Sequence, residues 1–367
     1  MTDSRVDKFA QILVDHSTRV KPGDRVAITA TTLAEPLVKA LYGWILERGG
    51  HPHVLFDFQG QDEIFYSKAK VEQLDFVPLF HKMAFDQFDV LIKLRSEANT
   101  RALTNTDSER QARRQKATST LLRAQMQRGA EKSLRWMSTQ YPTNAHAMEA
   151  EMGYEEYQDF FYRAIHADTD DPVGYWQGVQ QDQQRFIDRI QGHDKVELQG
   201  PNVELMLSVK GRTFLNACGE HNMPDGEIYT GPVEGSANGW VRYTYPAVFQ
   251  GKVVEGIELN FENGQVVQAS ATRHQDFLLK LLDTDAGARY IGEFAIGTNF
   301  EIDRFTRNIL FDEKIGGSFH MALGAGYPET GSLNKSVIHW DMICDLRRDS
   351  DILVDGELVY QNGQFVF

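Results

Sequence analysis

Apolar and polar residues alternate along the first 145 residues in a way that predicts strands and helices in turn. Short apolar runs predict four strands, at residues 25–30, 53–58, 89–94 and 134–139. A helix should follow the first strand, because apolar residues recur there on one helix face, at Leu33, Leu37, Leu41, Trp44 and Ile45. The spacing of Thr32 and Glu35 predicts a capping box at its start. Strands linked by crossovers of ten or more residues pair in parallel, so residues 1–145 are predicted to form an α/β domain with a mostly parallel sheet.

The pattern changes in the second half of the chain. Residues 147–192 are predicted to be mainly helical, and short strand-like runs separated by Gly and Pro turns follow, at residues 196–198, 203–209, 239–245 and 253–261. Two Asn-Gly pairs, Asn263-Gly264 and Asn362-Gly363, are typical of tight hairpins. We therefore predict a second, larger α+β domain with antiparallel strands over residues 146–367.

The turn after the first predicted strand argues against a nucleotide site. It runs Ala30-Thr31-Thr32-Leu33 and contains neither GxGxxG nor GxxxxGK[ST], so the backbone amides that cradle phosphates are missing. We interpret the N-terminal domain as a scaffold.

Composition narrows the class of protein further. The formal net charge of −14 leaves no broad cationic surface for phosphates, so we expect no nucleic-acid partner. No run approaches the roughly 18 apolar residues of a membrane span, and the start of the chain lacks the apolar core of a signal peptide, so we expect no membrane partner either. Two cysteines, Cys218 and Cys344, are too few for a disulfide framework, which favours small buried thiols in a reducing cytoplasm.

Candidate chemistry is concentrated between residues 220 and 345. The chain lacks HExxH, GxSxG and SxxK motifs. His339 and Asp341 are two residues apart, so on a strand both side chains would share one face. His320 lies in an apolar run, and Tyr327 follows two glycines of that run. Taken singly, each has an ordinary interpretation: a His–Asp pair at a strand end, a core histidine, and a packing tyrosine.

Two glutamates complete the candidate set. Glu293 follows an amphipathic segment and a glycine, and Glu227 stands on a short segment between turn residues. Either glutamate alone is more often a surface residue. Together with His320, His339 and Asp341 they supply three carboxylates and two imidazoles, which suit two Zn²⁺, Co²⁺ or Mn²⁺ ions about 3.5–4 Å apart. Magnesium or calcium would make little use of two histidines.

Four segments carry a resemblance to a known family. They are NMPDGEIYTGP at 222–232, GARYIGEFAIGTN at 287–299, LFDEKIGGSFHMALGAGY at 310–327 and NKSVIHWDM at 334–342. They closely resemble the thermophilic metalloprotease family of metallo-aminopeptidases, the group of aminopeptidases T, S and PepS. The resemblance covers essentially the whole chain. It implies an α/β N-terminal domain, a C-terminal catalytic domain with a two-metal centre, and a homodimer that encloses the active sites.

Carried over motif by motif, the family's metal ligands fall on Glu227, Glu293, His320, His339 and Asp341, and its active-site tyrosine falls on Tyr327. The resemblance favours Glu227 over Glu255, which is another carboxylate near the predicted hairpin. One departure concerns residues 203–205, where the family usually shows Thr-Asp-Leu and this chain has Val-Glu-Leu.

The prediction is a metal-dependent aminopeptidase that releases N-terminal residues from peptides with free amino termini. Two divalent ions per chain, Zn²⁺ or Co²⁺ with Mn²⁺ as a further option, would activate a water. Glu293 is the candidate proton acceptor, and Tyr327 would donate to the developing oxyanion. Two alternatives stay open: a two-metal amidase or phosphoesterase, and a non-catalytic family member that keeps the fold.

Overall fold

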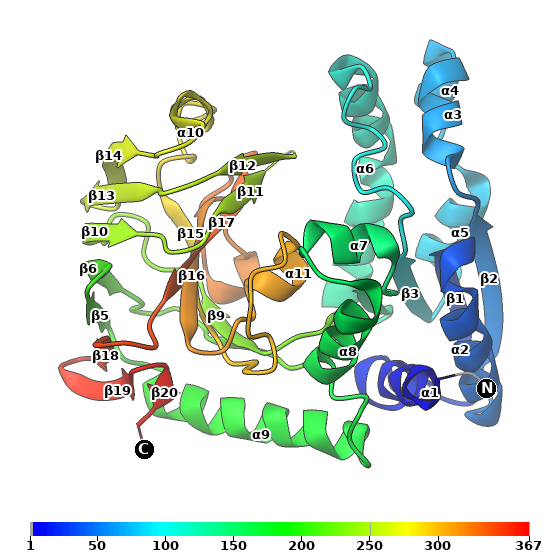
Figure 1. The fold of residues 1–367 in the computed structure, drawn as a ribbon, viewed down its shortest axis with the longest axis horizontal. Helices are drawn as coiled ribbons and strands as arrows, with labels where there is room; N and C mark the ends of the chain where they lie inside the picture. The colour runs from blue at the N-terminus through cyan, green and yellow to red at the C-terminus, as the bar shows by residue number, and fades with distance from the viewer. Residues whose placement is uncertain (1–2, 250, 367) are drawn as a thin grey trace. The chain divides into compact units, whose positions relative to one another are not determined.

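A computed structural model describes residues 3–249 and 251–366 (Figure 1). The chain divides into two compact units, one of Met1–Trp176 with Gly219–Met223 and the other of Gln177–Cys218 with Pro224–Phe367. These units are discontinuous in sequence, whereas the predicted domains 1–145 and 146–367 are continuous. The predicted functional division into a scaffold domain and a catalytic domain stays a prediction.

The first unit contains a five-stranded sheet in which every pair of neighbours is parallel. Its order is β2 (His51–Asp57), β1 (Arg25–Thr31), β3 (Val90–Arg95), β4 (Arg135–Gln140) and β8 (Asn222–Met223). The four predicted strands are thus confirmed to within a few residues. The fifth strand was not predicted: Asn222 and Met223 pair with Ser138 and Thr139, although they come from the second half of the sequence.

Helices make up much of the rest of the first unit. They are α1 (Ser4–Gln11), which continues as a π-helical turn (Ile12–Ser17), α2 (Glu35–Glu47), α3 (Gln61–Lys68), α4 (Val71–Leu74), α5 (Leu79–Gln87), α6 (Ser108–Ala130), α7 (Asn144–Glu149) and α8 (Tyr154–Ala164). Phe85 of α5 packs in one cluster with Ala27 and Leu91 of the sheet.

The predicted capping box at Thr32 and Glu35 is wrong. A short 3₁₀ turn (Thr32–Ala34) precedes α2, and the hydroxyl of Thr31 accepts the backbone N–H of Leu33 instead. Pro36 in the first turn of α2 has no N–H, so one of the donors that a cap would satisfy is absent.

The second unit is dominated by antiparallel strands. An eight-stranded sheet runs in the order β14 (Gln265–Ser270), β13 (Glu258–Glu262), β10 (Asn238–Arg242), β6 (Val203–Ser208), β5 (Lys195–Gly200), β18 (Asp351–Val354), β19 (Glu357–Gln361) and β20 (Gln364–Phe365). Asn263 and Gly264 join β13 to β14, and both have positive φ, as a tight hairpin turn requires. The predicted strand at 253–261 is split into β12 (Lys252–Val254), which pairs with β11 (Ala247–Phe249), and β13.

A second sheet of five strands carries the candidate residues. Its order is β17 (His339–Asp345), β16 (Ser318–Gly324), β15 (Ile291–Gly297), β9 (Glu227–Thr230) and β7 (Leu215–Ala217). One face joins the core of the unit, as shown by the fully buried Phe294, Phe319, Met321 and Trp340. Since side chains alternate along a strand, the other face is free to carry polar residues.

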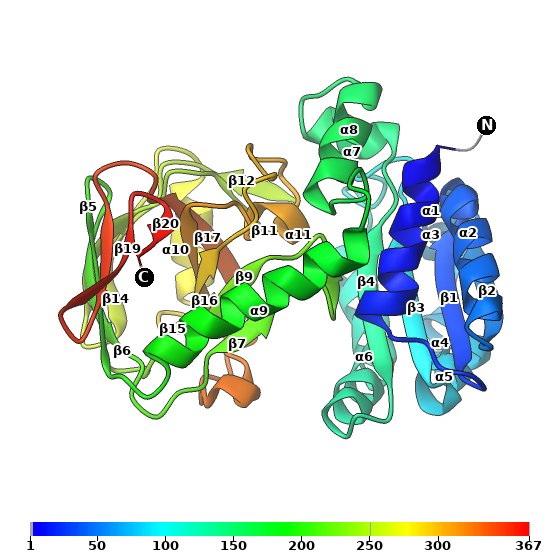
Figure 2. The same cartoon turned by 90° about the horizontal axis from the view of Figure 1, so that it is seen from below.

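Helices of the second unit are fewer. They comprise α10 (Gln275–Leu282), α11 (Ile309–Asp312) and most of the long helix α9 (Pro172–Ile190). Figure 2 shows α9 running past β9 and β15. Asn216 of β7 fixes part of this helix, because its side-chain Nδ2 donates to the carbonyl of Gln180 at 2.8 Å.

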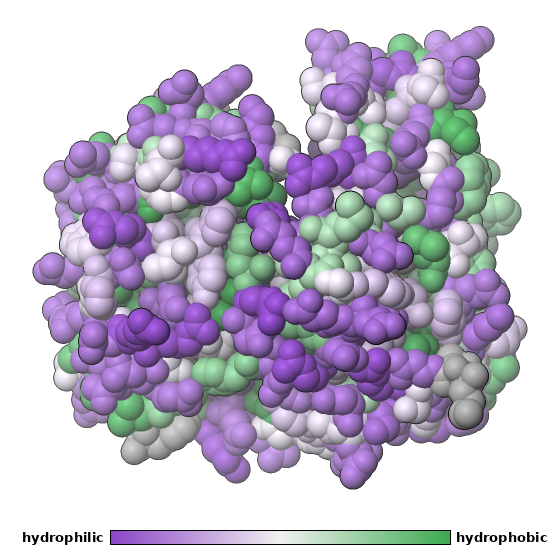
Figure 3. All heavy atoms as spheres, in the orientation of Figure 1, coloured by the Kyte–Doolittle hydropathy of each residue, from purple (hydrophilic) through white to green (hydrophobic). Residues whose placement is uncertain are grey.

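The surface of the protein is mainly hydrophilic on the face that Figure 3 draws, with smaller hydrophobic areas between the hydrophilic residues. Within residues 3–249 and 251–366, no helix combines the length and the apolar character needed to cross a membrane. Both cysteines are buried and free, as predicted.

Candidate metal centre

The five predicted ligands lie on four neighbouring strands of the five-stranded sheet. Strand β17 carries His339 and Asp341, β16 carries His320, β15 carries Glu293, and β9 begins at Glu227. The structure therefore brings together all five residues, from segments that are far apart in sequence.

Strand register places these side chains on one face. Glu293 is paired with Ala322, and Ala322 in turn with Asp341, so the three form one row across β15, β16 and β17. His320 lies two residues before Ala322, and residues two apart on a strand share a face.

Small residues leave room between the polar ones. Ala322 separates Glu293 from Asp341, Ala295 is paired with His320, and Gly297 is paired with Glu227. A Cβ atom on Gly297 would lie 2.3 Å from the carbonyl oxygen of Ile315, so this glycine also permits the close approach of the segment after α11.

Contact distances place the five predicted ligands in two potential ligand groups. His320 Nε2 lies 3.5 Å from Oε2 of Glu227 and 3.8 Å from Oε1 of Glu293. His339 Nε2 lies 3.2 Å from Oε2 of Glu293 and 3.4 Å from Oδ1 of Asp341. Potential ligand atoms within 4.8 Å of one another therefore form one group of Glu227, Glu293 and His320 and another of Glu293, His339 and Asp341. Glu293 belongs to both.

Several of these atoms lack the partners that buried polar groups normally have. Oε2 of Glu227, Nδ1 of His320 and Oδ1 of Asp341 are buried without a hydrogen-bond partner among the described residues. Buried polar atoms are satisfied in the large majority of cases, and a bound ion is one of the accepted explanations for exceptions. Carboxylates beside imidazoles are the donor set of Zn²⁺ and related ions. The residues present thus fit the divalent metals that the sequence predicts.

A backbone hydrogen bond fixes the orientation of the His339 ring. Its Nδ1 lies 2.8 Å from the carbonyl oxygen of Ala325, so Nδ1 carries the proton that it donates there. Nε2 is consequently the nitrogen that faces Glu293 and Asp341. A second hydrogen bond of this kind orients metal-binding histidines and selects their tautomer.

The pKa values of the candidate ligands are shifted by burial and by the neighbouring carboxylates. Burial alone would lower the pKa of His320, but its contact with Glu293 and the charge of Glu227 raise it to about 9. Burial likewise opposes ionisation of His339, while the charge of Asp341 and contacts with Glu293 raise the pKa of His339 to about 12. Burial raises the pKa of Glu227, and Lys314 opposes this shift. The carboxylates thus attract any cation, a proton included.

Tyr327 lies at the edge of this group. Its ring is 5.4 Å from that of His339 and 5.5 Å from that of Tyr229, measured between centroids, and both pairs are edge-to-face. About 37% of the residue is exposed. Burial and the charges of Glu293 and Asp341 raise the pKa of the phenol, so it stays protonated and able to donate a hydrogen bond.

Two neighbours were not singled out from the sequence. Lys314 is fully buried, and its Nζ lies 2.9 Å from Oε1 of Glu227 and also contacts Glu313. Glu313 forms a third potential ligand group with His320 and Asp341. Both residues belong to the segment LFDEKIGGSFHMALGAGY that carries the family resemblance, and this membership is the signal that could have identified them.

Comparison with known proteins agrees with this geometry. A sequence model described as thermophilic metalloprotease (M29) matches residues 2–365. The chain belongs to this family. It is 26% identical to "Aminopeptidase 2" of Geobacillus stearothermophilus, with 100% of this chain and 98% of the relative covered, and 27% identical to "Aminopeptidase T" of Thermus aquaticus, with 96% of each covered.

A solved structure of wild-type AmpT from Thermus thermophilus has the same fold. It matches with a TM-score of 0.87 over 99% of both chains, at 22% sequence identity. The predicted fold class, an α/β unit with a parallel sheet and a larger unit of antiparallel strands, is therefore confirmed.

Three further residues considered in the sequence, Glu255, Val203 and Glu204, lie outside the ligand groups of this metalloprotease. Glu255 makes an ion pair with Arg273 at 2.7 Å, and its side chain is 41% exposed. Val203 and Glu204 begin β6 in the eight-stranded sheet, where Val203 is buried and Glu204 is exposed. The departure from the family pattern thus falls on another sheet than the candidate ligands.

Proposed function

We propose that this metalloprotease is a metal-dependent aminopeptidase that uses two divalent ions. The observation that carries the proposal is the pair of ligand groups that share Glu293. A carboxylate common to two groups suits ions about 3.5–4 Å apart, the arrangement of two-metal hydrolases. The names of its relatives, aminopeptidases 2 and T, support a peptide substrate with a free amino terminus.

Each predicted ligand has a defined place in this proposal. Glu227 and His320 would hold one ion, His339 and Asp341 the other, and Glu293 both. Zn²⁺ and Co²⁺ suit imidazole and carboxylate donors, and Mn²⁺ also accepts them. A homodimer and a cytoplasmic location complete the proposal; the family resemblance supports the first, and the two free cysteines support the second.

The chemistry follows from the positions of the side chains. Bound ions would polarise the carbonyl of the first peptide bond and lower the pKa of a water molecule. Tyr327, which keeps its proton, donates a hydrogen bond to the oxygen that gains negative charge as the carbonyl is attacked. A neighbouring carboxylate takes a proton from the water and passes it to the leaving amine.

Two glutamates qualify as this proton carrier. Glu293 is the candidate from the sequence, but a glutamate that holds two ions is a weak base. Glu313 lies within 4.8 Å of ligand atoms of His320 and Asp341 without being one of the five predicted ligands. Burial raises its pKa, against the opposing charge of Lys314, and a higher pKa brings a carboxylate closer to the value that suits a general base.

Cleavage of only the first residue follows from the charge of the site. The potential ligand groups together offer four carboxylates, those of Glu227, Glu293, Glu313 and Asp341, and the first two are buried. A protonated or metal-bound amino terminus is stabilised there, whereas an internal peptide segment brings no such cation. This selects peptides by their free amino end.

The test is activity on a substrate panel before and after metal removal. Chelator-treated protein should lose activity on leucyl-arylamide and regain it with Zn²⁺, Co²⁺ or Mn²⁺, with one of these restoring the highest rate. Activity that resists chelation would refute the metal mechanism. Parallel assays on nitrophenyl phosphate and on an N-acetylated leucyl-arylamide separate an aminopeptidase from a phosphoesterase or a general amidase, which would hydrolyse one of these instead.

A further inference from the structure

A large polar crevice in the first unit has no part in the proposed metal chemistry. It encloses about 750 Å³ and is lined by the carboxyl ends of β1 and β3 together with the segments that follow β2 and β3. All of its lining residues belong to the first unit, whereas the five candidate ligands belong to the second. Its volume falls within the range of about 300–1,000 Å³ typical of small-molecule sites.

Its position in the sheet is where ligands bind in this class of fold. The strand order β2-β1-β3-β4 means that the chain leaves β1 toward one side and returns to its other side at β3. Ligands of open parallel sheets bind outside the carboxyl ends of the strands at such a switch point. Thr31 of β1 and Arg95 of β3 line the crevice at these ends.

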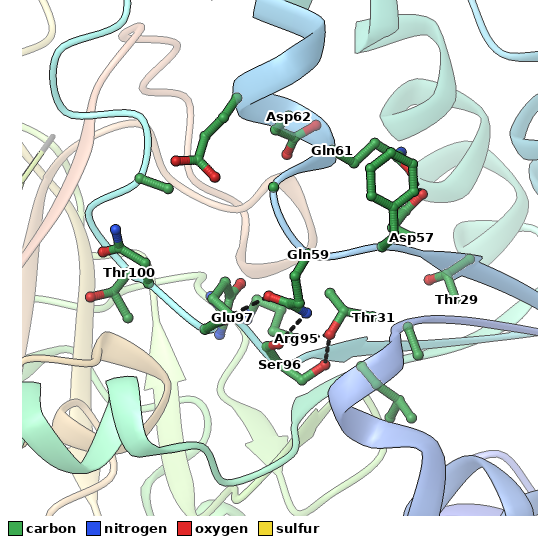
Figure 4. Close-up of a pocket in the computed structure, with 18 of the residues that line it drawn as sticks. Thr29, Thr31, Asp57, Gln59, Gln61, Asp62, Arg95, Ser96, Glu97 and Thr100 are labelled. Carbon is green, nitrogen blue, oxygen red and sulfur yellow. Dashed lines mark hydrogen bonds between the residues drawn. The ribbon is translucent and has the colours of Figure 1, made fainter.

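Charged residues of both signs line the crevice. Asp57 ends β2, and Asp62 lies in the first turn of α3, so both come from one segment. Arg95 ends β3, and Glu97 follows it in the same lining segment (Figure 4). Figure 4 shows Gln59 between Asp62 and Arg95 in this view, where it bonds to the carbonyl of Ser96.

Neither the charge of Arg95 nor that of Asp62 has a direct partner among residues 3–249 and 251–366. The guanidinium of Arg95 makes no hydrogen bond or ion pair there, although it interacts with the charge of the neighbouring Glu97. The carboxylate of Asp62 makes none either. Burial and the charge of Asp57 raise the pKa of Asp62, while Arg114 opposes the shift, which marks a carboxylate that a cation would stabilise. Some of the other lining groups have local partners: Gln61 donates to Asp57 at 2.7 Å, and Oε2 of Glu97 lies 2.9 Å from Nε2 of His146.

A phosphate-bearing ligand does not fit this crevice. The turn after β1 carries Thr31 and Thr32 in place of glycines, and a 3₁₀ turn separates it from α2. Glu35 and Pro36 occupy the first turn of α2, so that helix start offers a negative charge and one fewer N–H. A polyanion would also face four lining carboxylates, against the two lining cations Lys93 and Arg95. The carboxylates are those of Asp57, Asp62, Glu63 and Glu97.

We propose that the crevice binds a free amino acid, with Arg95 pairing with its carboxylate and Asp62 and Asp57 receiving its ammonium group. The exposed ring of Phe58 lines the same space and offers an apolar wall to the side chain. Amino acids are the products of the proposed reaction, so such a site would sense product. That consequence rests on the proposed function, whereas the binding itself does not.

The test is equilibrium dialysis of the metal-loaded full-length protein against labelled L-leucine. The wild type should bind leucine, and Arg95→Gln and Asp62→Asn should each weaken that binding about tenfold or more, because each removes a charged hydrogen-bond partner. Arg123→Gln, an equal change of charge on exposed α6 away from the crevice, should bind like the wild type. Isoamylamine and 4-methylpentanoate, which carry one charge each, should bind more weakly than leucine.

Stoichiometry separates this proposal from the proposed function. If both hold, the wild type binds two leucines per chain and Arg95→Gln binds one, with unchanged kcat/KM on leucyl-arylamide at low product concentration. If only the crevice proposal holds, the wild type binds one leucine per chain and Arg95→Gln binds none. Equal binding by wild type and Arg95→Gln would overturn the crevice proposal, and so would tighter Arg95-dependent binding of adenosine or inorganic phosphate.

Discussion

Lys314 places its Nζ 2.9 Å from Oε1 of Glu227, with the lysine side chain fully buried and that of the glutamate 8% exposed. This pair compensates one carboxylate of the candidate centre while leaving its second oxygen, Oε2, without a hydrogen bond. Lys314 thus fixes one oxygen of this candidate ligand, and the other oxygen, Oε2, faces His320 at 3.5 Å.

Replacing Lys314 should therefore destabilise the metal-free protein more than the metal-loaded one. Breaking a buried ion pair typically costs roughly 3–5 kcal/mol, because the remaining charge is uncompensated. In Lys314→Met a bound ion would compensate Glu227 again, so urea unfolding with and without chelator should show a larger difference than in the wild type. Lys210→Met, at a side chain that is 78% exposed, is the matched control. Equal losses in both forms would assign Lys314 to packing alone.

Metal content should separate the predicted ligands from the rejected carboxylate. Glu227→Ala and Asp341→Ala remove members of the two ligand groups, so bound metal per chain should fall in both variants. Glu255→Ala removes only an exposed partner of Arg273 and should retain full metal content. Elemental analysis after dialysis measures this directly, and comparable loss in all three variants would show that the assignment of Glu227 is wrong.

Tyr327→Phe should lower kcat without releasing metal. The substitution removes the phenolic proton donor but keeps the ring that packs against His339 and Tyr229. Loss of one oxyanion donor typically lowers kcat by about 10²–10³-fold. An unchanged kcat at full metal content would leave Tyr327 with only a packing role.

Glu313→Gln and Glu293→Gln should distinguish base from ligand. If Glu313 carries the proton, its glutamine variant keeps the metal and loses about 10²–10⁴-fold in kcat, the usual contribution of a general base. Glu293→Gln should lose metal, because Glu293 belongs to both ligand groups. Metal content and kcat measured on the same preparations distinguish these two roles. An active Glu313→Gln enzyme would leave Glu293 as the candidate general base.

Metal uptake should release protons and strengthen as pH rises. The raised pKa values of about 9 for His320 and about 12 for His339 mean that both imidazoles are charged in the metal-free protein at neutral pH. Each must lose a proton to bind an ion, so affinity should rise by up to about tenfold per pH unit for each histidine below pH 9. Calorimetric titrations in buffers of different ionisation enthalpy count these protons, and uptake without proton release would contradict the prediction.

The stability of the metal-free protein should fall as pH rises, whereas its affinity for metal should increase. A charged His320 stabilises the fold fully below its unfolded pKa of about 6.5, and this contribution is lost as pH rises through about 9. Urea unfolding of the metal-free protein, measured across this pH range, should show the loss of stability. The metal-loaded protein should not show it, because His320 is already deprotonated there.

Periodicity in the sequence determined the two kinds of sheet. The sequence itself supplied the residue types of the candidate metal centre. Apolar runs such as residues 25–30 and 89–94 specify buried parallel strands, and Asn263-Gly264 specifies a hairpin, because both depend on neighbours along the chain. His339 and Asp341 share a face for the same local reason.

Only the tertiary structure decided which distant residues meet. Hydrogen-bond register between strands sets the row of Glu293, Ala322 and Asp341, and no local pattern encodes that register. The close approach of Ile315 to Gly297 brings Lys314 to Glu227, and the pairing of β8 with β4 joins residues more than 80 positions apart. Such contacts depend on packing between segments. The sequence therefore determined which residue types could serve as ligands, while the fold determined that these candidate residues lie together.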